Sequence, residues 1–350
     1  MKKIPLLCVP FLMIGTTALA DEMSYPKFSG FLDIELEDDW VYKSEDESQE
    51  LNDLYPTITL GATLEFTKEF SFNFEGTAEP VEAAEENRAF EDQGYYVGVL
   101  TANYETDQFS VYGGKFTPNF GIAWYATPGL FGTDINEDYE LAEMLGFGGS
   151  VNFDAAGEHT VSASIFSLDT SFLSDSFGTS RGPLLQSDGG ATNTEDLSNF
   201  ALALDGQFNA VEGFSYHAGF SALNNGIDGD KTQLGYVVGV QYELPISENF
   251  LLLPLAEIAY FDNADAIDGN TAKYATIGLG LNYDQWFGSA TYQRRDTEIS
   301  GVDNDDYIAA FSVGYAFDIG IEIMAGWGVA EEESVRRETL GLYAYYGFEF

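Results

Sequence analysis

The sequence contains one cysteine, two histidines and few basic residues. The cysteine, Cys8, lies within the first twenty residues, so the rest of the chain offers no disulfide and no thiolate ligand, which excludes redox and cysteine–zinc chemistry. The motifs G-x-S-x-G, H-E-x-x-H and the phosphate-binding P-loop are also missing. Beyond residue 20 no run of about 18 apolar residues occurs. We therefore expect no catalytic residues, no bound cofactor and no transmembrane helices.

The first twenty residues have the pattern of a Sec signal peptide. Lys2 and Lys3 supply a positive start, residues 4–15 form a short apolar stretch, and Ala18-Leu19-Ala20 matches an A-x-A cleavage site. A membrane anchor is the alternative, but the apolar stretch is shorter than the ~20 residues that a spanning helix needs. We expect cleavage after residue 20, so that residues 21–350 form the exported protein.

Acidic residues dominate the exported part of the chain. Residues 21–350 carry all 58 Asp and Glu residues and 12 of the 14 Lys and Arg residues, which gives a formal charge of −46. Such a chain repels nucleic acid and attracts cations. It is nevertheless rich in aromatic residues, with 28 Phe and 21 Tyr, whereas acidic disordered chains have few. Charge and apolar surface must therefore be separated in space, as in a soluble β-protein or a membrane barrel.

Apolar residues recur with a period of two, which is typical of β-strands with one apolar and one polar face. In segment 54–66 one face carries Ile58, Leu60, Ala62, Leu64 and Phe66, and the other carries Thr57, Thr59, Gly61, Thr63 and Glu65. Sixteen such segments are predicted, at 25–36, 54–66, 70–78, 94–104, 108–116, 144–153, 158–168, 197–207, 213–223, 232–243, 249–261, 272–283, 286–295, 306–317, 319–329 and 339–350. The number is even, as in single-chain bacterial barrels.

The links between these segments alternate in length. Short links occur at 67–69, 105–107, 284–285 and 318, whereas long ones occur at 37–53, 79–93, 117–143, 169–196, 262–271, 296–305 and 330–338. Outer-membrane barrels have this arrangement, with the short turns in the periplasm, whereas a soluble sandwich has no reason for it. We predict an all-β fold: one transmembrane antiparallel β-barrel of about 16 strands, comprising residues 21–350 and in contact with outer-membrane lipid and lipopolysaccharide.

Aromatic residues support the same orientation. Those beside the short turns are predicted to form a periplasmic girdle: Phe70, Phe153, Tyr242, Tyr283, Trp286, Phe317 and Phe350. The last segment also has an aromatic residue at its end and another two positions earlier, Phe348. This pattern resembles the C-terminal targeting signal of outer-membrane proteins. We therefore expect the Gram-negative outer membrane as the location.

A barrel of sixteen strands is too wide for side chains to fill, so it should enclose a water-filled channel. The positions predicted to face inward are mostly polar or small. The charged or titratable candidates for the pore lining are Glu35, Glu65, Glu75, His217, Glu257 and Glu322.

Over essentially residues 21–350, the chain resembles the general diffusion porins of Gram-negative bacteria. The resemblance lies in the number of strands, in the alternation of short and long links, and in the aromatic pattern of the last segment. The resemblance implies that loop 117–143 folds into the barrel and narrows it, and that the protein is a homotrimer. The start of this loop, Thr117-Pro118-Asn119-Phe120-Gly121, is similar to the family's Pro-x-Phe-Gly. The loop contains no Lys or Arg, and its acidic constriction candidates are Asp134, Glu137, Asp138, Glu140 and Glu143.

The chain departs from the family in its basic residues. The family places an arginine cluster from early strands opposite the acidic loop, but residues 21–104 contain only Lys27, Lys43, Lys68 and Arg88. The basic candidates on the wall are Lys115, Lys273, Arg294 and Arg295. Arg295 has inward parity, whereas Arg294 does not unless it lies above the lipid. Lys115 faces lipid on strict alternation unless Gly113-Gly114 forms a bulge that turns it inward. A weakly balanced acidic constriction would favour cations.

We therefore expect a porin for passive diffusion of small hydrophilic solutes and ions, with a preference for cations. A substrate-specific channel, for example for carbohydrates, is the nearest alternative, because Phe31, Tyr95, Phe166, Tyr343 and Tyr345 also have inward parity. A barrel enzyme is a more remote one. The acidic loops could bind Ca²⁺ or Mg²⁺ at the cell surface, or could simply be solvated, because none has the spacing of a defined calcium loop.

Overall fold

The structure is a computed structural model that describes residues 24–227 and 231–350. The predicted signal peptide, residues 1–20, lies outside these ranges. In the described residues sixteen strands form the wall of a barrel: β1 (Lys27–Ser44), β2 (Asn52–Glu65), β3 (Phe70–Pro80), β5 (Gln93–Glu105), β6 (Phe109–Phe116), β7 (Met144–Asp154), β8 (Gly157–Leu168), β10 (Asn199–Phe208), β11 (Phe214–Leu223), β12 (Gln233–Tyr242) continued by β13 (Leu244–Ser247), β14 (Phe250–Asp262), β15 (Thr271–Tyr283), β16 (Trp286–Ile299), β17 (Val302–Ala316), β18 (Ile321–Glu332) and β19 (Val335–Glu349).

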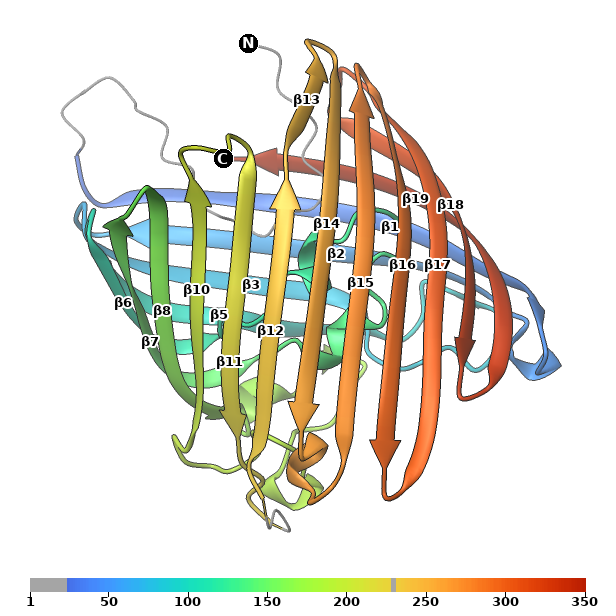
Figure 1. The fold of residues 1–350 in the computed structure, drawn as a ribbon, viewed down its shortest axis with the longest axis horizontal. Helices are drawn as coiled ribbons and strands as arrows, with labels where there is room; N and C mark the ends of the chain where they lie inside the picture. The colour runs from blue at the N-terminus through green and yellow to red at the C-terminus, as the bar shows by residue number, and fades with distance from the viewer. Residues whose placement is uncertain (1–23, 228–230) are drawn as a thin grey trace.

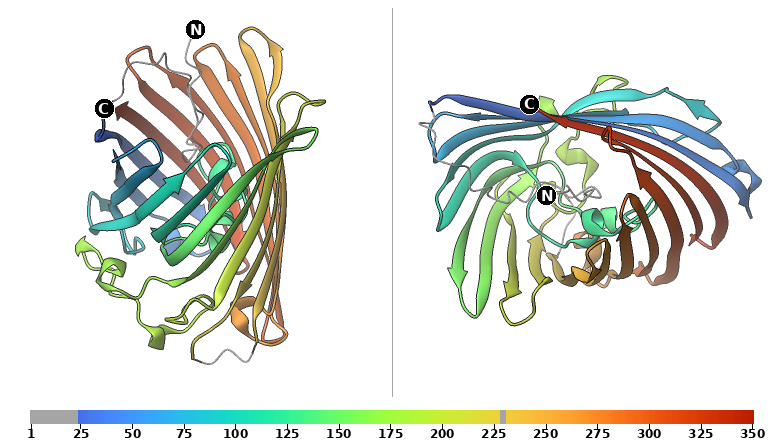
Figure 2. Two further views of the ribbon diagram at one scale, coloured as in Figure 1. Left: turned by 90° about the vertical axis from the view of Figure 1, so that its left-hand side faces the viewer. Right: turned by 90° about the horizontal axis from the view of Figure 1, so that it is seen from above.

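Neighbouring wall strands are antiparallel and follow the order of the chain, and β19 pairs with β1 to close the ring (Figures 1 and 2). The closing register runs from Phe31 opposite Glu349 to Ser44 opposite Arg337. Because the ring is closed, the first and last strands have no free edge, and their backbone polar groups find partners without water, as a lipid environment requires. In the described part of the chain, no helix has the length and apolarity to cross a membrane.

Alternation along each strand separates the two faces as predicted. On β15, Ile277 is 65% exposed on the outer face, whereas its neighbour Thr276 is 2% exposed on the inner face. Several of the aromatic residues beside the short turns are large exposed groups on the outside: Phe153, Tyr283, Trp286, Phe317 and Phe350. Outward apolar residues and inward polar residues are the pattern of a barrel that is surrounded by lipid and encloses water.

Two of the predicted long links are wrong. The links at 296–305 and 330–338 are tight hairpins, because β16 and β17 are joined by Ser300 and Gly301, and β18 and β19 by Glu333 and Ser334. All four turn residues have positive φ, as two-residue hairpins of the favoured hand require. The link at 37–53 is also shorter than predicted, since β1 continues to Ser44. These strand ends carry acidic residues because they extend beyond the apolar band into water.

The wall has a gap where loop 117–143 leaves it. Strand β6 ends at Phe116, and its pairing with β5 stops at Leu100 opposite Lys115, although β5 begins at Gln93. The exposed edge of β5 is partly covered by loop 169–198, whose short strand β9 (Phe177–Gly178) pairs with Gly94 and Tyr95. A second short strand, β4 (Arg88–Ala89), pairs with the start of β2. Two loops are thereby fixed to the rim of the barrel.

Candidate functional site in the barrel lumen

Loop 117–143 lies inside the ring of strands, where Figure 2 shows it in teal in the view from above. It contains the short helix α1 (Ala123–Ala126) and the 3-10 turn η2 (Asn136–Tyr139). Its apolar residues are buried against the far wall: Phe120 is 1% exposed, and its ring centroid lies 5.8 Å from that of Phe261 on β14. Packing therefore holds the loop against the wall of β11 to β17 rather than in the middle of the lumen.

Glu257 on β14 is the strongest polar anchor of this loop. It is 2% exposed, and its Oε2 accepts a hydrogen bond from the backbone N–H of Ile122 at 2.7 Å. Its Oε1 accepts from the N–H of Ala123 at 2.9 Å and from the hydroxyl of Tyr139 at 2.7 Å. Three donors from two parts of the loop meet one carboxylate, and hydrogen bonds to a charged group are the strong ones.

His217 on β11 is a second anchor. The N–H of Gly121 donates to Nε2 of His217 at 2.9 Å, which leaves the imidazole proton on Nδ1, where it faces Oδ1 of Asp205 at 2.7 Å. The other oxygen of Asp205 accepts from Asn119 at 2.7 Å. The interior parity predicted for His217 and Glu257 agrees with the structure, but their predicted contact with water does not. The loop covers both residues, so they hold the loop instead of lining an open pore.

Further along, Gln293 and Ser312 hold the tip of the loop. Gln293 is fully buried and accepts from the side chain of Asn136 at 3.0 Å, while Ser312 accepts from the N–H of Leu130 at 3.0 Å. These polar residues lie on β16 and β17, at inward positions of the wall. The loop therefore has hydrogen-bonded contacts with the wall along most of its length.

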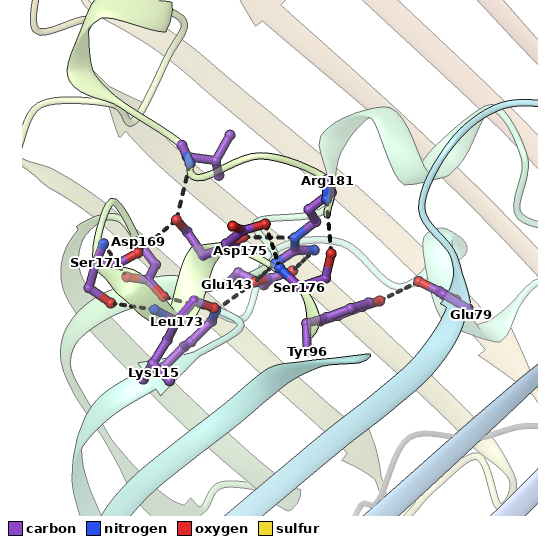
Figure 3. A network of polar contacts seen from close by, with 12 residues as sticks. Glu79, Tyr96, Lys115, Glu143, Asp169, Ser171, Leu173, Asp175, Ser176 and Arg181 are labelled. Atoms are coloured by element: carbon purple, nitrogen blue, oxygen red, sulfur yellow. Dashed lines mark hydrogen bonds and ion pairs between the residues drawn. The ribbon is translucent and has the colours of Figure 1, made fainter. Parts of the chain in front are cut away.

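Lys115 and Glu143 form an ion-pair network at the base of the loop (Figure 3). Nζ of Lys115 lies 2.6 Å from Glu143 and 2.8 Å from Asp169, and it donates to the carbonyl of Leu173 at 2.9 Å. Hydrogen bonds from Lys115 and Ser171 lower the pKa of Asp169, although burial opposes this shift. Lys115 is 1% exposed, so the prediction that it could reach the pore is wrong.

The distorted backbone at Gly114, with φ of +136°, precedes Lys115 where the strand ends. Loop 169–198 then covers the lysine side chain from outside. The negative charge of Glu143 is balanced by Arg181, which donates to both carboxylate oxygens at 2.7 and 2.6 Å. The guanidinium of Arg181 also lies over the ring of Tyr96, 4.1 Å from its centroid. The sequence reasoning missed Arg181. It could have been noticed as the one basic residue of the loop at 169–196.

Arg295 faces the interior as predicted, but carboxylates surround it. Its guanidinium lies 2.6 Å from Asp138 of the loop and 2.5 Å from Asp306 on β17. Asp138 also accepts from the hydroxyl of Tyr274 at 3.1 Å. Two carboxylates therefore bind this one arginine, which leaves no positive charge in excess. Arg295 therefore links the loop to the wall, and it is not an unpaired positive charge facing the acidic loop.

Three loop carboxylates have no basic partner among the described residues: Asp134, Glu137 and Glu140. The carboxylate of Glu137 accepts a hydrogen bond from the hydroxyl of Thr133, at 2.8 Å. Withdrawal from bulk water inside the barrel, with repulsion from Glu137 and other carboxylates, raises the pKa of Glu140 to about 7. The same causes raise the pKa of Asp134 to about 7, against the opposing charge of Arg337.

The wall that faces these carboxylates is acidic too. Asp134 is close enough to Asp39 on β1 for repulsion, and Glu140 is close enough to Glu75 and Glu79 on β3. Glu35, also half-buried on β1, has Tyr343 as a hydrogen-bond partner. The predicted pore-lining residues Glu35 and Glu75 thus lie on the acidic wall. Carboxylates of the loop therefore face carboxylates of the wall across the lumen. In the porin family, arginines stand opposite the acidic loop instead.

The remaining two candidates lie at the other end of the barrel. Glu65 ends β2 beside a short turn and lies 3.9 Å from Lys27, and Glu322 is the second residue of β18. Neither contacts loop 117–143 within the described residues. No group of three or more His, Cys, Asp or Glu residues in those ranges is arranged to hold a metal ion. Binding of Ca²⁺ or Mg²⁺ at the acidic loops stays a prediction.

Loop 117–143 borders two cavities. One, of about 510 Å³, lies beside Asp39, Asp53, Phe131, Asp134 and Arg337. The other, of about 500 Å³, lies between the loop, loop 169–198 and strands β14 to β17, and its lining includes Tyr139, Glu140, Phe261, Tyr274 and Arg295. Both are of the size of small-molecule sites in proteins.

Comparison with known proteins finds no matching family model and no matching curated protein. Solved structures match over nearly the whole chain. The outer membrane channel DcaP of Acinetobacter baumannii has a TM-score of 0.59 at 12% identity, covering 92% of this chain and 96% of that one. OccK2 (OpdF) of Pseudomonas aeruginosa, in complex with glucuronate, has a TM-score of 0.58 at 11% identity, with 92% and 98% covered.

OpdK of Pseudomonas aeruginosa with vanillate has a TM-score of 0.57 at 9% identity, with 92% and 99% covered. At such low identity these matches show the fold alone. The predicted fold is confirmed: this chain is a closed antiparallel barrel of sixteen strands, like the Gram-negative outer-membrane channels that it matches.

Proposed function

We propose that this protein is an outer-membrane channel that passes small hydrophilic solutes by diffusion and prefers cations. One observation carries the proposal: loop 117–143 lies in the lumen and places three carboxylates opposite an acidic wall. These carboxylates, Asp134, Glu137 and Glu140, have no basic partner in the part of the chain that the structure describes. We propose that the passage between loop and wall is the constriction of the channel.

Charge balance supports the preference for cations. The basic residues that approach the loop are bound to carboxylates: Lys115, Arg181, Arg295 and Arg337. The passage between the loop and β1 to β3 therefore has a negative potential that nearby positive charges do not offset. A narrow path with low-dielectric walls focuses such a field, so cations become concentrated in it and anions are depleted.

A substrate-specific channel is the second candidate. Two of the matching structures hold organic acids, vanillate in OpdK and glucuronate in OccK2. The acidic lumen of the present chain is unfavourable for such anions, because carboxylates in a confined passage repel them. A specific substrate of this channel would therefore differ in charge from those two ligands.

Planar-bilayer recording under a KCl gradient tests the proposal. We expect step-like conductance with a reversal potential of cation-selective sign. The triple variant Asp134→Asn, Glu137→Gln, Glu140→Gln should bring the reversal potential towards zero. The control, Glu105→Gln, removes an exposed carboxylate beside a short turn and should leave it unchanged. Absence of conductance would overturn the channel, and anion selectivity would overturn the cation preference.

Homotrimer formation is also a proposal. In loop 169–198, Phe172 and Phe177 have 86% and 85% of their surface exposed, and Phe177 lies opposite Tyr95, which is 56% exposed. Exposed apolar patches of this kind mark contact surfaces. We expect trimers in native mass measurement after mild extraction, and the double variant Phe172→Ser, Phe177→Ser should weaken them. A wild-type monomer would contradict the proposal.

A further inference from the structure

The cavity of about 500 Å³ between loop 117–143 and strands β14 to β17 has an apolar floor. Three rings meet there: the centroid of Tyr139 lies 4.9 Å from that of Tyr274 and 6.0 Å from that of Phe261. Leu141 and Met144 complete the floor. Both tyrosine hydroxyls are already used, one by Glu257 and one by Asp138, so the floor offers mainly ring and hydrocarbon surface to a solute.

The rim of the same cavity is acidic. Five carboxylates line it, those of Asp138, Glu140, Asp265, Asp306 and Glu333, together with one guanidinium, that of Arg295. Arg295 is bound by Asp138 and Asp306, which leaves the other three carboxylates without a basic partner among the described residues. The cavity thus combines an aromatic floor with a clear excess of negative charge.

We propose that this cavity is a binding subsite for organic cations that have an aromatic or hydrocarbon body, such as arylalkyl ammonium ions. The subsite rests on the proposed channel function and names a substrate class for it. An ammonium group is attracted by the carboxylates of the rim, and the apolar body of the ion packs on the aromatic and aliphatic side chains of the floor. Anions are repelled by the rim. Hydrated inorganic cations gain nothing from the floor, and neutral sugars do not compensate the rim charges.

The test is current block in planar bilayers at pH 8, where Glu140 is ionised. The organic cation is 2-phenylethylammonium, added on the side of the long loops. The comparison compounds are ethylammonium, which lacks the ring, and phenylacetate, which has the opposite charge. We expect block by 2-phenylethylammonium at a lower concentration than by ethylammonium, and no block by phenylacetate.

Two variants separate the rim from the floor. Glu140→Gln should raise the half-blocking concentration of 2-phenylethylammonium about fivefold, as the loss of one charge partner of about 1 kcal/mol would do. Phe261→Leu should reduce the preference for the ringed cation over ethylammonium about threefold. Glu105→Gln is the control, since it also removes one carboxylate but lies beside a short turn, away from this cavity and from the constriction. It should leave this preference unchanged.

Retained heat-modifiable mobility on gels will show that each variant is folded. Equal block by both ammonium ions, or an unchanged half-blocking concentration in Glu140→Gln, would overturn the subsite. The reversal potential under a KCl gradient, recorded in the same membranes, distinguishes the two proposals. A cation-selective channel without ring-dependent block refutes the subsite alone, whereas an anion-selective channel refutes the cation preference itself.

Discussion

Glu257 shows how much of the lumen depends on one side chain. Replacement by alanine would leave two buried N–H groups and the hydroxyl of Tyr139 without their acceptor, which costs about 1–3 kcal/mol for each group. We expect Glu257→Ala to release part of loop 117–143 from the wall. Single-channel recording should then show a larger and noisier conductance than in the wild type.

The control for this variant is Glu322→Ala, which removes a half-buried inward carboxylate that contacts no part of the loop. It should leave the noise unchanged. If Glu257→Ala conducts with the wild-type amplitude and noise, the loop does not depend on this anchor.

Glu140 and Asp134 give the channel a pH dependence. The pKa of each is raised to about 7, so each carboxyl group is largely charged at pH 8 and largely neutral at pH 6. Neutral carboxyl groups attract no cations. Cation selectivity should therefore fall as the pH is lowered from 8 to 6, which reversal potentials at each pH will measure. The double variant Glu140→Gln, Asp134→Asn should flatten this profile, and an equally steep profile would assign the titration to other groups.

Strand parity correctly predicted that the side chains of Arg295, His217 and Glu257 point into the barrel. It could not predict which of them remain in water, because a loop from a distant part of the chain covers two of the three. For Lys115, strand parity does not predict the direction of the side chain. This residue lies at the end of a strand, after a distorted glycine and beneath loop 169–198. Such contacts depend on tertiary structure that alternation does not encode.

At the scale of elements, loop 169–198 partly covers the gap that loop 117–143 leaves in the wall, and Lys115 contacts both loops. Lys115→Met would leave Asp169 and Glu143 without the lysine, and loss of one partner of a buried ion pair costs about 3–5 kcal/mol. We expect loop 169–198 to detach locally, so that limited proteolysis of the folded protein cuts within it at least several times faster.

A suitable control is Lys273→Met, which removes an exposed lysine near the start of β15. Its cleavage rate should equal that of the wild type. If Lys115→Met is as resistant as Lys273→Met, the backbone pairing of β9 with β5 is sufficient to hold the loop.

The number of strands and the place of the third long loop in the sequence were predictable, because alternation and turn residues are local signals. The hairpins at Ser300-Gly301 and Glu333-Ser334 were not, since their strands project from the membrane and carry polar residues on both faces. Apolar alternation reports only the part of a strand that lies within lipid. The acidic ends therefore resembled loops, and both links were predicted to be too long.

At the scale of the whole molecule, the shortage of basic residues in the early strands already indicated that no arginine wall opposes the acidic loop. What the sequence could not show is which carboxylates are left over. Arg295 and Arg181 each bind an acidic residue of loop 117–143, and Asp134, Glu137 and Glu140 are those without a basic partner among the described residues. The distribution of pairing, rather than net charge, determines where the negative potential lies.

Barrel closure depends on the seam between β1 and β19, and Gly30 lies at its end. Backbone hydrogen bonds of 2.9 Å join Gly30 and Phe350 in both directions, and the ring of Phe350 lies across the glycine. A Cβ atom at Gly30 would approach the carbonyl oxygen of Gly61 to 2.5 Å and the ring to 2.7 Å. Because the carbonyl belongs to the backbone of β2, the clash cannot be relieved by a side-chain rotation.

We therefore expect Gly30→Ala to weaken closure of the entire barrel, since an opened seam exposes two strand edges to lipid. The temperature at which the folded band disappears on heat-modifiability gels should fall, and the yield of folded protein should fall with it. Gly98→Ala is the matched control, because the nearest atom to a Cβ atom there lies 3.8 Å away. Equal melting of both variants would show that the seam can absorb the clash, and that closure depends on the paired length of β1 and β19 instead.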